Sequence, residues 1–203
     1  MSKGKLVVVS GPSGAGKSTI CQRAAADSEC YLSISATTRS PREGEGKSHY
    51  IFLSEQEFKD KIGNNEFLEY ATVHGNFYGT MKKPVFDNIE TGNNVILEID
   101  VQGSLQIKNI YPECEMVFIL PPSLKEMKKR LAGRKTETEE QFKLRLKNAV
   151  MEIKTAHEYD YLIINDNIDF AVEQLKEIIK LLNKKVKYNK EFIDNFVKEG
   201  KDL

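Results

Sequence analysis

Short runs of mostly apolar residues recur along the chain and are separated by longer segments of helical character. The clearest runs lie at residues 6–9, 95–99, 116–120 and 161–164, and a shorter run lies at residues 31–34. The first run, Leu6-Val7-Val8-Val9, is uninterrupted, which is typical of a strand buried on both faces of a parallel sheet. These runs therefore predict the strands of a single sheet.

Helix starts and apolar stripes occupy the segments between these runs. Ser54, Ser123 and Thr138 each stand three residues before a Glu or Gln, so they mark helix starts. Two segments then repeat apolar residues at helical spacing. They are Phe142, Leu146, Ala149, Val150 and Ile153 in the first, and Ile168, Ala171, Leu175, Ile178, Ile179 and Leu182 in the second. Strands that alternate with helices predict an α/β fold with a mostly parallel sheet flanked by helices.

Two stretches fit this alternation badly and are predicted to be insertions. Residues 35–85 are rich in Thr, Arg, Gly, Tyr and Glu and predict a small mixed α+β unit, whereas the highly charged residues 126–157 predict a helical flap. The remaining segments form the predicted core, and these are residues 4–34, 86–125 and 158–184. Residues 185–203 are predicted to be a basic amphipathic tail whose helix packs on its own chain or on a partner.

Length and composition narrow the class of protein. The chain has 203 residues, 40% hydrophobic and 30% charged, so it can bury a core as one domain with insertions. Thirty basic and thirty acidic residues give zero formal charge, which argues against a generic nucleic-acid or anionic-membrane binder. No apolar run approaches the ~20 residues of a membrane span, and no secretory leader is visible. Three cysteines without CxxC spacing favour a reducing cytoplasm over a disulfide framework or a zinc site.

A phosphate-binding motif follows the first predicted strand. It consists of Gly11, Pro12, Ser13, Gly14, Ala15, Gly16, Lys17 and Ser18, and Thr19 comes next. Glycines let successive backbone N–H groups turn toward phosphate oxygens, and the following helix adds its positive end. Lys17 supplies a charge to the β- and γ-phosphates, and the Ser18 hydroxyl can bind Mg²⁺. Because the motif follows a buried strand and opens a helix, it predicts nucleoside triphosphate binding.

The motif alone does not identify the phosphate acceptor. A GTPase would carry an Asn-Lys-x-Asp motif to read guanine, and the sequence has none. An ATPase would carry an acidic residue at a strand end, and Glu98 and Asp100 do not exclude that class. The first insertion is therefore the segment that distinguishes the remaining classes.

That insertion contains residues suited to a second dianionic group. Arg39 and Arg42 lie three residues apart beside Pro41. Guanidinium groups bind phosphate through two parallel hydrogen bonds, so two converging arginines suit a phosphate monoester. Tyr50 and Tyr78 carry phenols that can donate to the same oxygens. Each of these residues alone is more often a surface or packing residue, and their combination with a phosphate loop favours a second substrate site.

Several motifs in collinear order resemble the guanylate kinase family. They are Ser-x-Ser-x-Thr-Thr-Arg-x-Pro-Arg from Ser33, the segments 65–70, 75–80 and 98–103, Pro121-Pro122-Ser123, Arg130-Leu131-Ala132-Gly133-Arg134 and Ile164-Asn165-Asp166. The resemblance covers residues 4–184. It implies a P-loop NTPase-type core, a GMP-binding insertion at residues 35–85 and a mobile lid at residues 126–157.

The resemblance also implies roles for matching residues. The GMP phosphate would be held by Arg39, Arg42, Tyr50 and Tyr78, and guanine would be read by Ser35, Glu69, Thr80 and Asp100. The loop 11–18 with Lys17 would hold the phosphates of ATP with Mg²⁺. Arg134 and Arg145 would close on the transferred phosphoryl group, with Arg130 and, on weaker grounds, Asn167 near the adenine. Glu98 stands where relatives carry Asp, which leaves its role toward metal or water open.

The expected activity is ATP-dependent phosphorylation of GMP, and of dGMP, to the diphosphate in purine nucleotide metabolism. The expected partners are therefore ATP and GMP, with no nucleic acid and no membrane. The alternative is a catalytically silent module that binds a protein through the GMP groove, although such relatives typically lose the phosphate loop. Another nucleoside monophosphate kinase would not be expected to carry the Glu69 and Thr80 pair.

Overall fold

The computed structural model describes residues 3–28, 30–41, 50–73, 75–132 and 139–200. The larger of its two sheets contains β1 (Leu6–Ser10), β2 (Cys30–Leu32), β7 (Asn94–Glu98), β8 (Glu115–Leu120) and β9 (Tyr161–Ile164). Their order is β2-β7-β1-β8-β9 and every pairing is parallel, which confirms the predicted α/β class. The predicted apolar runs match these strands to within one or two residues at each end.

β1 is the central strand of this sheet, and all of its residues are buried. Val8 pairs with Leu97 of β7 on one side and with Met116 of β8 on the other. A strand that is flanked on both sides and covered on both faces needs apolar residues at every position. This requirement explains the uninterrupted apolar run that opens the chain.

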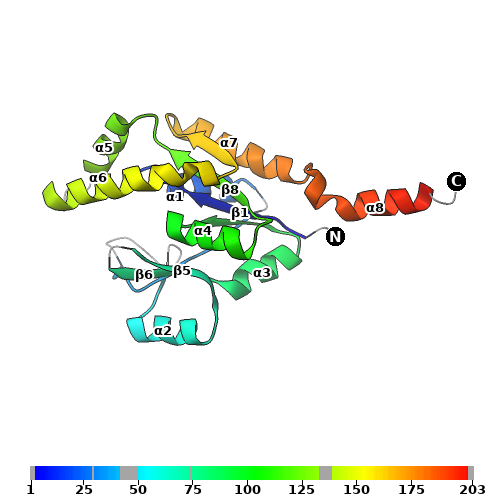
Figure 1. Ribbon diagram of the computed structural model, residues 1–203, viewed down its shortest axis with the longest axis horizontal. Coiled ribbons are helices and arrows are strands. Elements are labelled where there is room, and N and C mark those ends of the chain that lie inside the picture. Colours follow the sequence, from blue (N-terminus) through cyan, green and yellow to red (C-terminus); the bar gives the residue numbers. More distant parts are fainter. Residues whose placement is uncertain (1–2, 29, 42–49, 74, 133–138, 201–203) are drawn as a thin grey trace.

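Helices cover both faces of the larger sheet (Figure 1). They are α1 (Lys17–Ala26) and α7 (Ile168–Leu182) on one face, and α3 (Lys82–Glu90) and α4 (Val101–Ile110) on the other. Val7 and Val9 pack with α1 and α7, whereas Leu6 and Val8 pack with α3 and α4. The predicted apolar stripe of α7 lies in the first of these cores, so that prediction is confirmed.

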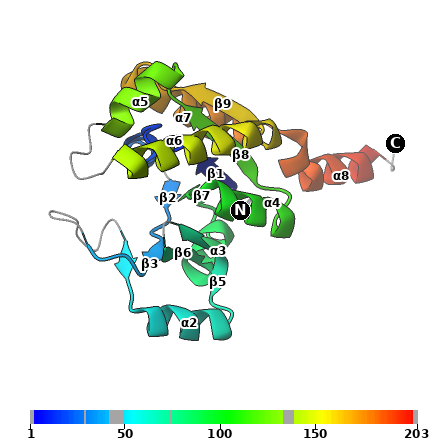
Figure 2. The same ribbon diagram turned by 60° about the vertical axis from the view of Figure 1, so that its left-hand side comes forward.

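A second sheet occupies part of the predicted first insertion. Its strands are β3 (Ala36–Thr37), β4 (Ile51–Phe52), β5 (Phe67–Val73) and β6 (Asn76–Met81), in the order β4-β3-β6-β5. α2 (Glu55–Gly63) starts at Ser54, whose side chain accepts a hydrogen bond from the backbone of Glu57, as predicted. Phe58 of α2 stacks on Phe67 at 4.3 Å between ring centroids, so α2 and this sheet share a small core (Figure 2).

Two helices form the charged region after β8. They are α5 (Leu124–Ala132) and α6 (Glu139–Ile153), followed by the 3-10 helix η1 (Lys154–Glu158). Met127 and Leu131 of α5 pack against Ala149 and other apolar residues of α6. The prediction that Val150 shares this face is wrong, because Val150 lies next to Ala149 and turns toward solvent. The predicted helix start at Thr138 lies outside the described residues.

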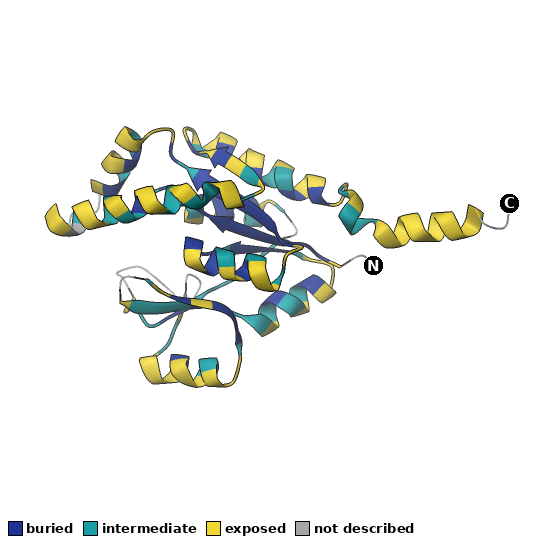
Figure 3. Ribbon diagram, in the orientation of Figure 1, coloured by how far each residue is buried: buried dark blue, intermediate teal, exposed yellow. Residues whose placement is uncertain are grey.

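The tail forms a 3-10 helix, η2 (Val186–Tyr188), and a final helix, α8 (Lys190–Glu199). Every residue of α8 is exposed, and Figure 3 shows the helix extending away from the body. Packing of α8 on its own chain, one of two predicted arrangements, is therefore wrong. The preceding turn is fixed instead, since Lys185, Lys187 and Tyr188 all contact the buried Glu115. No helix among the described residues is long and apolar enough to cross a membrane.

Candidate active site

The phosphate loop joins the carboxyl end of β1 to the amino end of α1. Two of its glycines are required by their surroundings. Gly11 has a φ of 144°, and a Cβ there would lie 2.2 Å from the carbonyl oxygen of Ile119. Gly16 has a φ of 90°, and a Cβ there would lie 2.4 Å from the side-chain amide of Asn165. The loop can therefore curl tightly against the strand ends only with glycine at these positions.

Lys17, the first residue of α1, turns back over this loop. Its Nζ donates to the carbonyl oxygen of Gly11 at 2.6 Å and to that of Pro12 at 3.2 Å. Desolvation lowers the pKa of Lys17, while the carboxylates of Glu98, Glu152 and Asp100 act in the opposite direction. The structure thus confines a cation inside the loop, among groups that phosphate oxygens can replace.

Ser18 and Glu98 face each other across the end of β7. The Ser18 hydroxyl donates to Oε1 of Glu98 at 2.5 Å. A hydroxyl and a carboxylate beside the phosphate loop are the oxygen donors that Mg²⁺ prefers, so these residues fit that ion. The next residue, Thr19, is exposed in the first turn of α1.

α6 brings two charged side chains onto the phosphate loop. Nη2 of Arg145 donates to the Ser13 hydroxyl at 2.8 Å. Glu152 lies seven residues later, hence two turns along the same helix face, and its carboxyl interacts with the Ser13 backbone amide and with Lys17. Burial raises the pKa of Glu152, and Lys17 partly offsets that effect. The sequence prediction included Arg145 and missed Glu152. The spacing of seven residues between them in a predicted helix indicates that both side chains lie on the same face.

The turn after β9 supports the loop from behind. The buried Asn165 donates from Nδ2 to the carbonyl oxygen of Ala15 at 2.8 Å. The backbone carbonyl oxygen of Asn165 accepts a hydrogen bond from Arg130 at 3.0 Å. The sequence analysis quoted Asn165 only as part of a motif and gave it no role. Asn167, which is predicted to contact adenine, lies at the start of α7, where its Oδ1 accepts from the amides of residues 169 and 170.

The second half of the site centres on a buried carboxylate in the smaller sheet. Glu69 of β5 is 4% exposed, and its Oε1 accepts a hydrogen bond from the Thr80 hydroxyl at 2.6 Å. A Cβ at residue 103 would lie 2.4 Å from its Oε2, so Gly103 of α4 leaves room for this carboxylate. Burial, with the nearby charge of Asp100, raises the pKa of Glu69 to about 7, although the Thr80 hydrogen bond lowers it. The structure therefore brings together two residues predicted to read guanine.

A cationic and aromatic cluster is formed by Arg39, which follows β3, Tyr50, which precedes β4, and Tyr78 of β6. The guanidinium of Arg39 lies over the ring of Tyr50, 5.4 Å from its centroid, and the rings of Tyr50 and Tyr78 meet edge-on at 6.0 Å. Three residues predicted to hold a phosphate are therefore neighbours. Ser35 lies just before β3 and is half-buried. Arg42 and Arg134 lie outside the described residues.

The charge of Asp100 acts on both halves of the site, the phosphate loop and the buried Glu69. Asp100 caps α4 by accepting from the backbone amides of Gln102 and Gly103 at 2.7 and 3.2 Å. Its charge acts on Glu69 in one direction and on Lys17 in the other. Asp100 therefore lies close enough to both the phosphate loop and the buried carboxylate for its charge to act on each.

Comparisons with known proteins agree with this geometry. A family model described as guanylate kinase matches residues 3–182. The chain belongs to the guanylate kinase family. It is 54% identical to the guanylate kinase of Clostridium acetobutylicum over 179 residues, which cover 87% of this chain and 85% of that protein. It is 45% identical to the guanylate kinase of Clostridioides difficile over 202 residues, which cover 98% of each.

A solved guanylate kinase from Anaplasma phagocytophilum shares the fold. Its TM-score is 0.78 at 31% identity, and the match covers 91% of this chain and 88% of that one. Because close relatives along nearly the whole chain are named as the enzyme, a catalytically silent module is not favoured.

Proposed function

We propose that the chain transfers the γ-phosphoryl group of ATP to the phosphate of GMP. Guanylate kinase activity follows from family membership, and the proposal concerns how the described residues carry it out. The observation that supports it most directly is the buried Glu69 and Thr80 pair. This pair lies in the small sheet, Arg39 follows strand β3 of the same sheet, and the charge of Asp100 acts on both Glu69 and Lys17.

The base of the acceptor would be recognised at Glu69. Guanine presents two adjacent donors, N1–H and the N2 amino group, and one carboxylate can accept from both. The Ser35 hydroxyl would donate to O6, and the Thr80 hydroxyl would do so after turning away from the Glu69 carboxylate, with Asp100 as a further acceptor. Adenine has no hydrogen on N1 and no amino group at C2, so Glu69 would remain buried without a partner. Sites built in this way can reject an analogue by about 10⁴–10⁵.

The phosphate of GMP would lie in the cationic and aromatic cluster. Arg39 supplies a guanidinium that lies over the Tyr50 ring, and Tyr78 adds a second phenol. Arg42 would complete this group as the second guanidinium. Charge-assisted hydrogen bonds from arginine are short and strong, which suits a dianion that must be held in one orientation.

The donor phosphates would lie in the loop 11–18, with Lys17 turned from the loop carbonyls onto their oxygens. Ser18 and Glu98 would hold Mg²⁺, which neutralises phosphate charge when bound. Arg145 already reaches the loop at Ser13, and with Arg134 it would contact the phosphoryl group in transfer. Arg130, whose guanidinium donates to the backbone carbonyl of Asn165, would lie near the adenine.

Catalysis in this arrangement would come from charge and position. The acceptor is a phosphate oxygen that is already ionised at neutral pH, so the site needs no general base. The protein must instead align donor and acceptor and stabilise charge on the transferred group. Residues 126–157 would act as a lid on the core and on the GMP-binding insertion 35–85. This lid would exclude water as a competing acceptor. We place this reaction in the cytoplasm, which the cysteine usage favours.

A coupled assay of ADP release tests the proposal. GMP, dGMP, AMP, CMP and UMP are offered in turn with ATP, with and without Mg²⁺. We expect rapid turnover with GMP and dGMP, strong discrimination against the other three, and loss of turnover when Mg²⁺ is chelated. Equal rates with AMP and GMP would contradict the role of Glu69, and a protein that binds neither nucleotide would support the silent module.

A further inference from the structure

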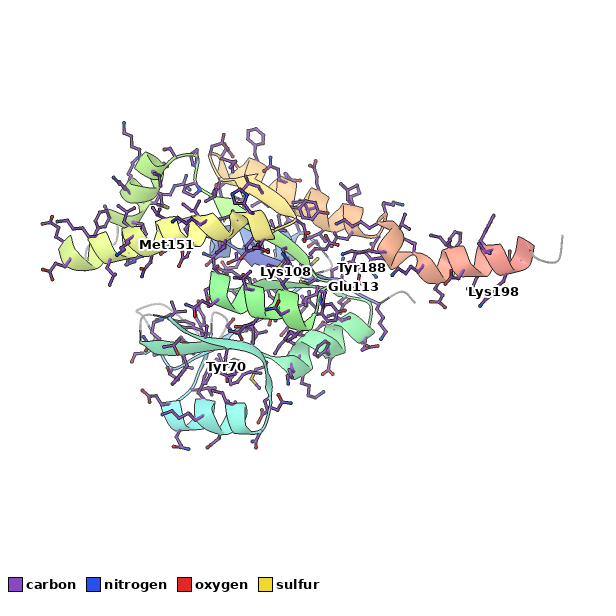
Figure 4. All side chains as sticks on the ribbon, in the orientation of Figure 1. Tyr70, Lys108, Glu113, Met151, Tyr188 and Lys198 are labelled. Atoms are coloured by element: carbon purple, nitrogen blue, oxygen red, sulfur yellow. The ribbon has the colours of Figure 1, made fainter. Side chains whose placement is uncertain are left out.

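A cavity of about 220 Å³ lies far from the phosphate loop, at the amino end of β1. It is bounded by three segments of the chain: the entry to β1, the turn between α4 and β8, and the turn that leads into α8. Its lining includes the lysines Lys3, Lys5, Lys187 and Lys190, together with Tyr111, Glu113 and Tyr188. Figure 4 shows Glu113 and Tyr188 side by side in this region. Four of these residues are lysines and one is acidic, so the cavity is strongly basic.

Lys5 is the unusual member of this group. It is 7% exposed, and its ammonium donates to the carbonyl oxygen of Lys3 at 2.6 Å and lies 4.6 Å from the centroid of the Tyr188 ring. Among the described residues, no carboxylate forms an ion pair with it. Lysine is rarely buried without an acidic partner, because an isolated charge is costly to remove from water. Burial accordingly lowers the pKa of Lys5.

The other lysines differ in how their charge is balanced. Lys3 pairs with Glu90 at 2.7 Å, and Lys187 pairs with the buried Glu115 at 2.7 Å. Lys187 also lies 4.8 Å from the centroid of Tyr188, so two ammonium groups contact the same ring. Lys190 is exposed at the first position of α8 and forms no ion pair with any described residue. Two cations of the cavity, Lys5 and Lys190, therefore have no counter-charge within the part of the chain that the structure describes.

We propose that this cavity binds a small phosphorylated anion. Compact ammonium groups from separate segments suit phosphate oxygens, which accept several charge-assisted hydrogen bonds at once. The hydroxyl group of Tyr111, which also lines the cavity, can add a neutral donor. Bound phosphate would supply the charge that Lys5 lacks. It would also connect the start of β1 to the turn that carries α8.

This site is distinct from the one that performs phosphoryl transfer. β1 runs from Leu6, beside the cavity, to Ser10, beside the phosphate loop. The two sites therefore lie at opposite ends of the same strand. None of the residues that line the cavity belongs to the proposed substrate sites, so variants here can be tested in an active enzyme.

Nuclear magnetic resonance of the full chain can test this proposal with inorganic pyrophosphate as the probe. Backbone amide shifts are followed during titration of wild type, Lys5→Met, Lys190→Met and Lys198→Met. Lys198 lies far along α8 (Figure 4), so its variant removes the same charge outside the cavity and serves as the matched control. The signals of residues 3–6, 111–113 and 187–190 report on the cavity, whereas those of residues 11–18 report on the phosphate loop.

We expect the cavity signals to shift together and to saturate. Lys5→Met and Lys190→Met should each weaken this binding at least tenfold, and Lys198→Met should leave it unchanged. If Lys5→Met fails to fold, Lys190→Met gives the answer alone, because its side chain is exposed. Shifts confined to the phosphate loop would overturn the proposal. Equal weakening by all three variants, or equal binding of citrate, would overturn it as well.

Discussion

The buried carboxylate of Glu69 should make both stability and GMP binding depend on pH near neutrality. Its pKa is raised to about 7 from an ordinary 4.5, and burial is the main cause. The folded protein therefore holds a proton at Glu69 between these two values, where the unfolded chain has released it. Stability falls with rising pH wherever the folded state binds more protons. The carboxyl should cost nothing below pH 4.5, and its full penalty should be present above pH 7.

The size of this penalty follows from the shift. At about 1.4 kcal/mol per pKa unit, a rise from 4.5 to 7 corresponds to roughly 3 kcal/mol. Glu69→Gln keeps an oxygen for the Thr80 hydroxyl and cannot ionise. We therefore expect Glu69→Gln to match wild type at pH 4.5 and to exceed it by up to roughly 3 kcal/mol in free energy of unfolding at pH 8. Urea unfolding of both proteins without ligand, at half-unit steps of pH, measures this difference.

GMP binding should show the opposite trend. The carboxylate, and not the protonated acid, accepts both donors of guanine, so affinity should rise with pH. With a pKa of about 7, the ionised fraction grows from about a tenth at pH 6 to about nine-tenths at pH 8. The phosphate of GMP also titrates in this range. We therefore take the ratio of the wild-type dissociation constant to that of Glu69→Gln, because the contribution of the phosphate cancels in this ratio. A pH-independent ratio, with a pH-independent difference in stability, would refute the reasoning.

Other substitutions test the remaining parts of the site. Lys17→Met should keep the far-UV circular dichroism spectrum and lower turnover by about 10²–10³, and a variant that keeps a tenth of wild-type turnover would contradict the role of Lys17. Arg145→Ala should lower kcat strongly and leave the GMP dissociation constant nearly unchanged; a parallel rise in that constant at normal kcat would contradict a role in transfer. Truncation after Asn189 should preserve activity and stability, because α8 is fully exposed. Truncation after Lys185 removes two partners of the buried Glu115 and should cost on the order of 2 kcal/mol in urea unfolding.

The sequence predicted the larger sheet well because its signals are local. β1 is apolar at every position since both of its faces are covered, and the motif from Gly11 to Ser18 is defined by steric and charge requirements of the backbone itself. Helix starts such as Ser54 were equally readable, because a capping box is formed by residues three apart. The family resemblance then added the long-range part. Glu69 and Thr80 lie eleven residues apart, and only the pairing of β5 with β6 makes them neighbours.

What the sequence did not predict depends on contacts between distant segments. Asn165 looks like an ordinary turn residue until β9 is placed beside β8, where its amide meets the loop at Ala15. Glu152 looks like a solvated helix charge until α6 lies over Ser13. The packing of the tail, residues 185–203, was mispredicted for a related reason. Its amphipathic pattern favours packing, but the pattern does not say on what, and the contacts to Glu115 stop before α8 begins.

The amino end of α4 explains how two carboxylates can coexist in the guanine half of the site. Glu69 and Asp100 repel each other, which helps to raise the pKa of Glu69. Asp100 nevertheless accepts from the first free amides of α4, and Gly103 in the same turn contacts the Glu69 carboxylate. The positive end of a helix favours negative charge within its first turn. α4 therefore offsets part of the repulsion, and it does so at the point where the guanine half-site meets the phosphate loop.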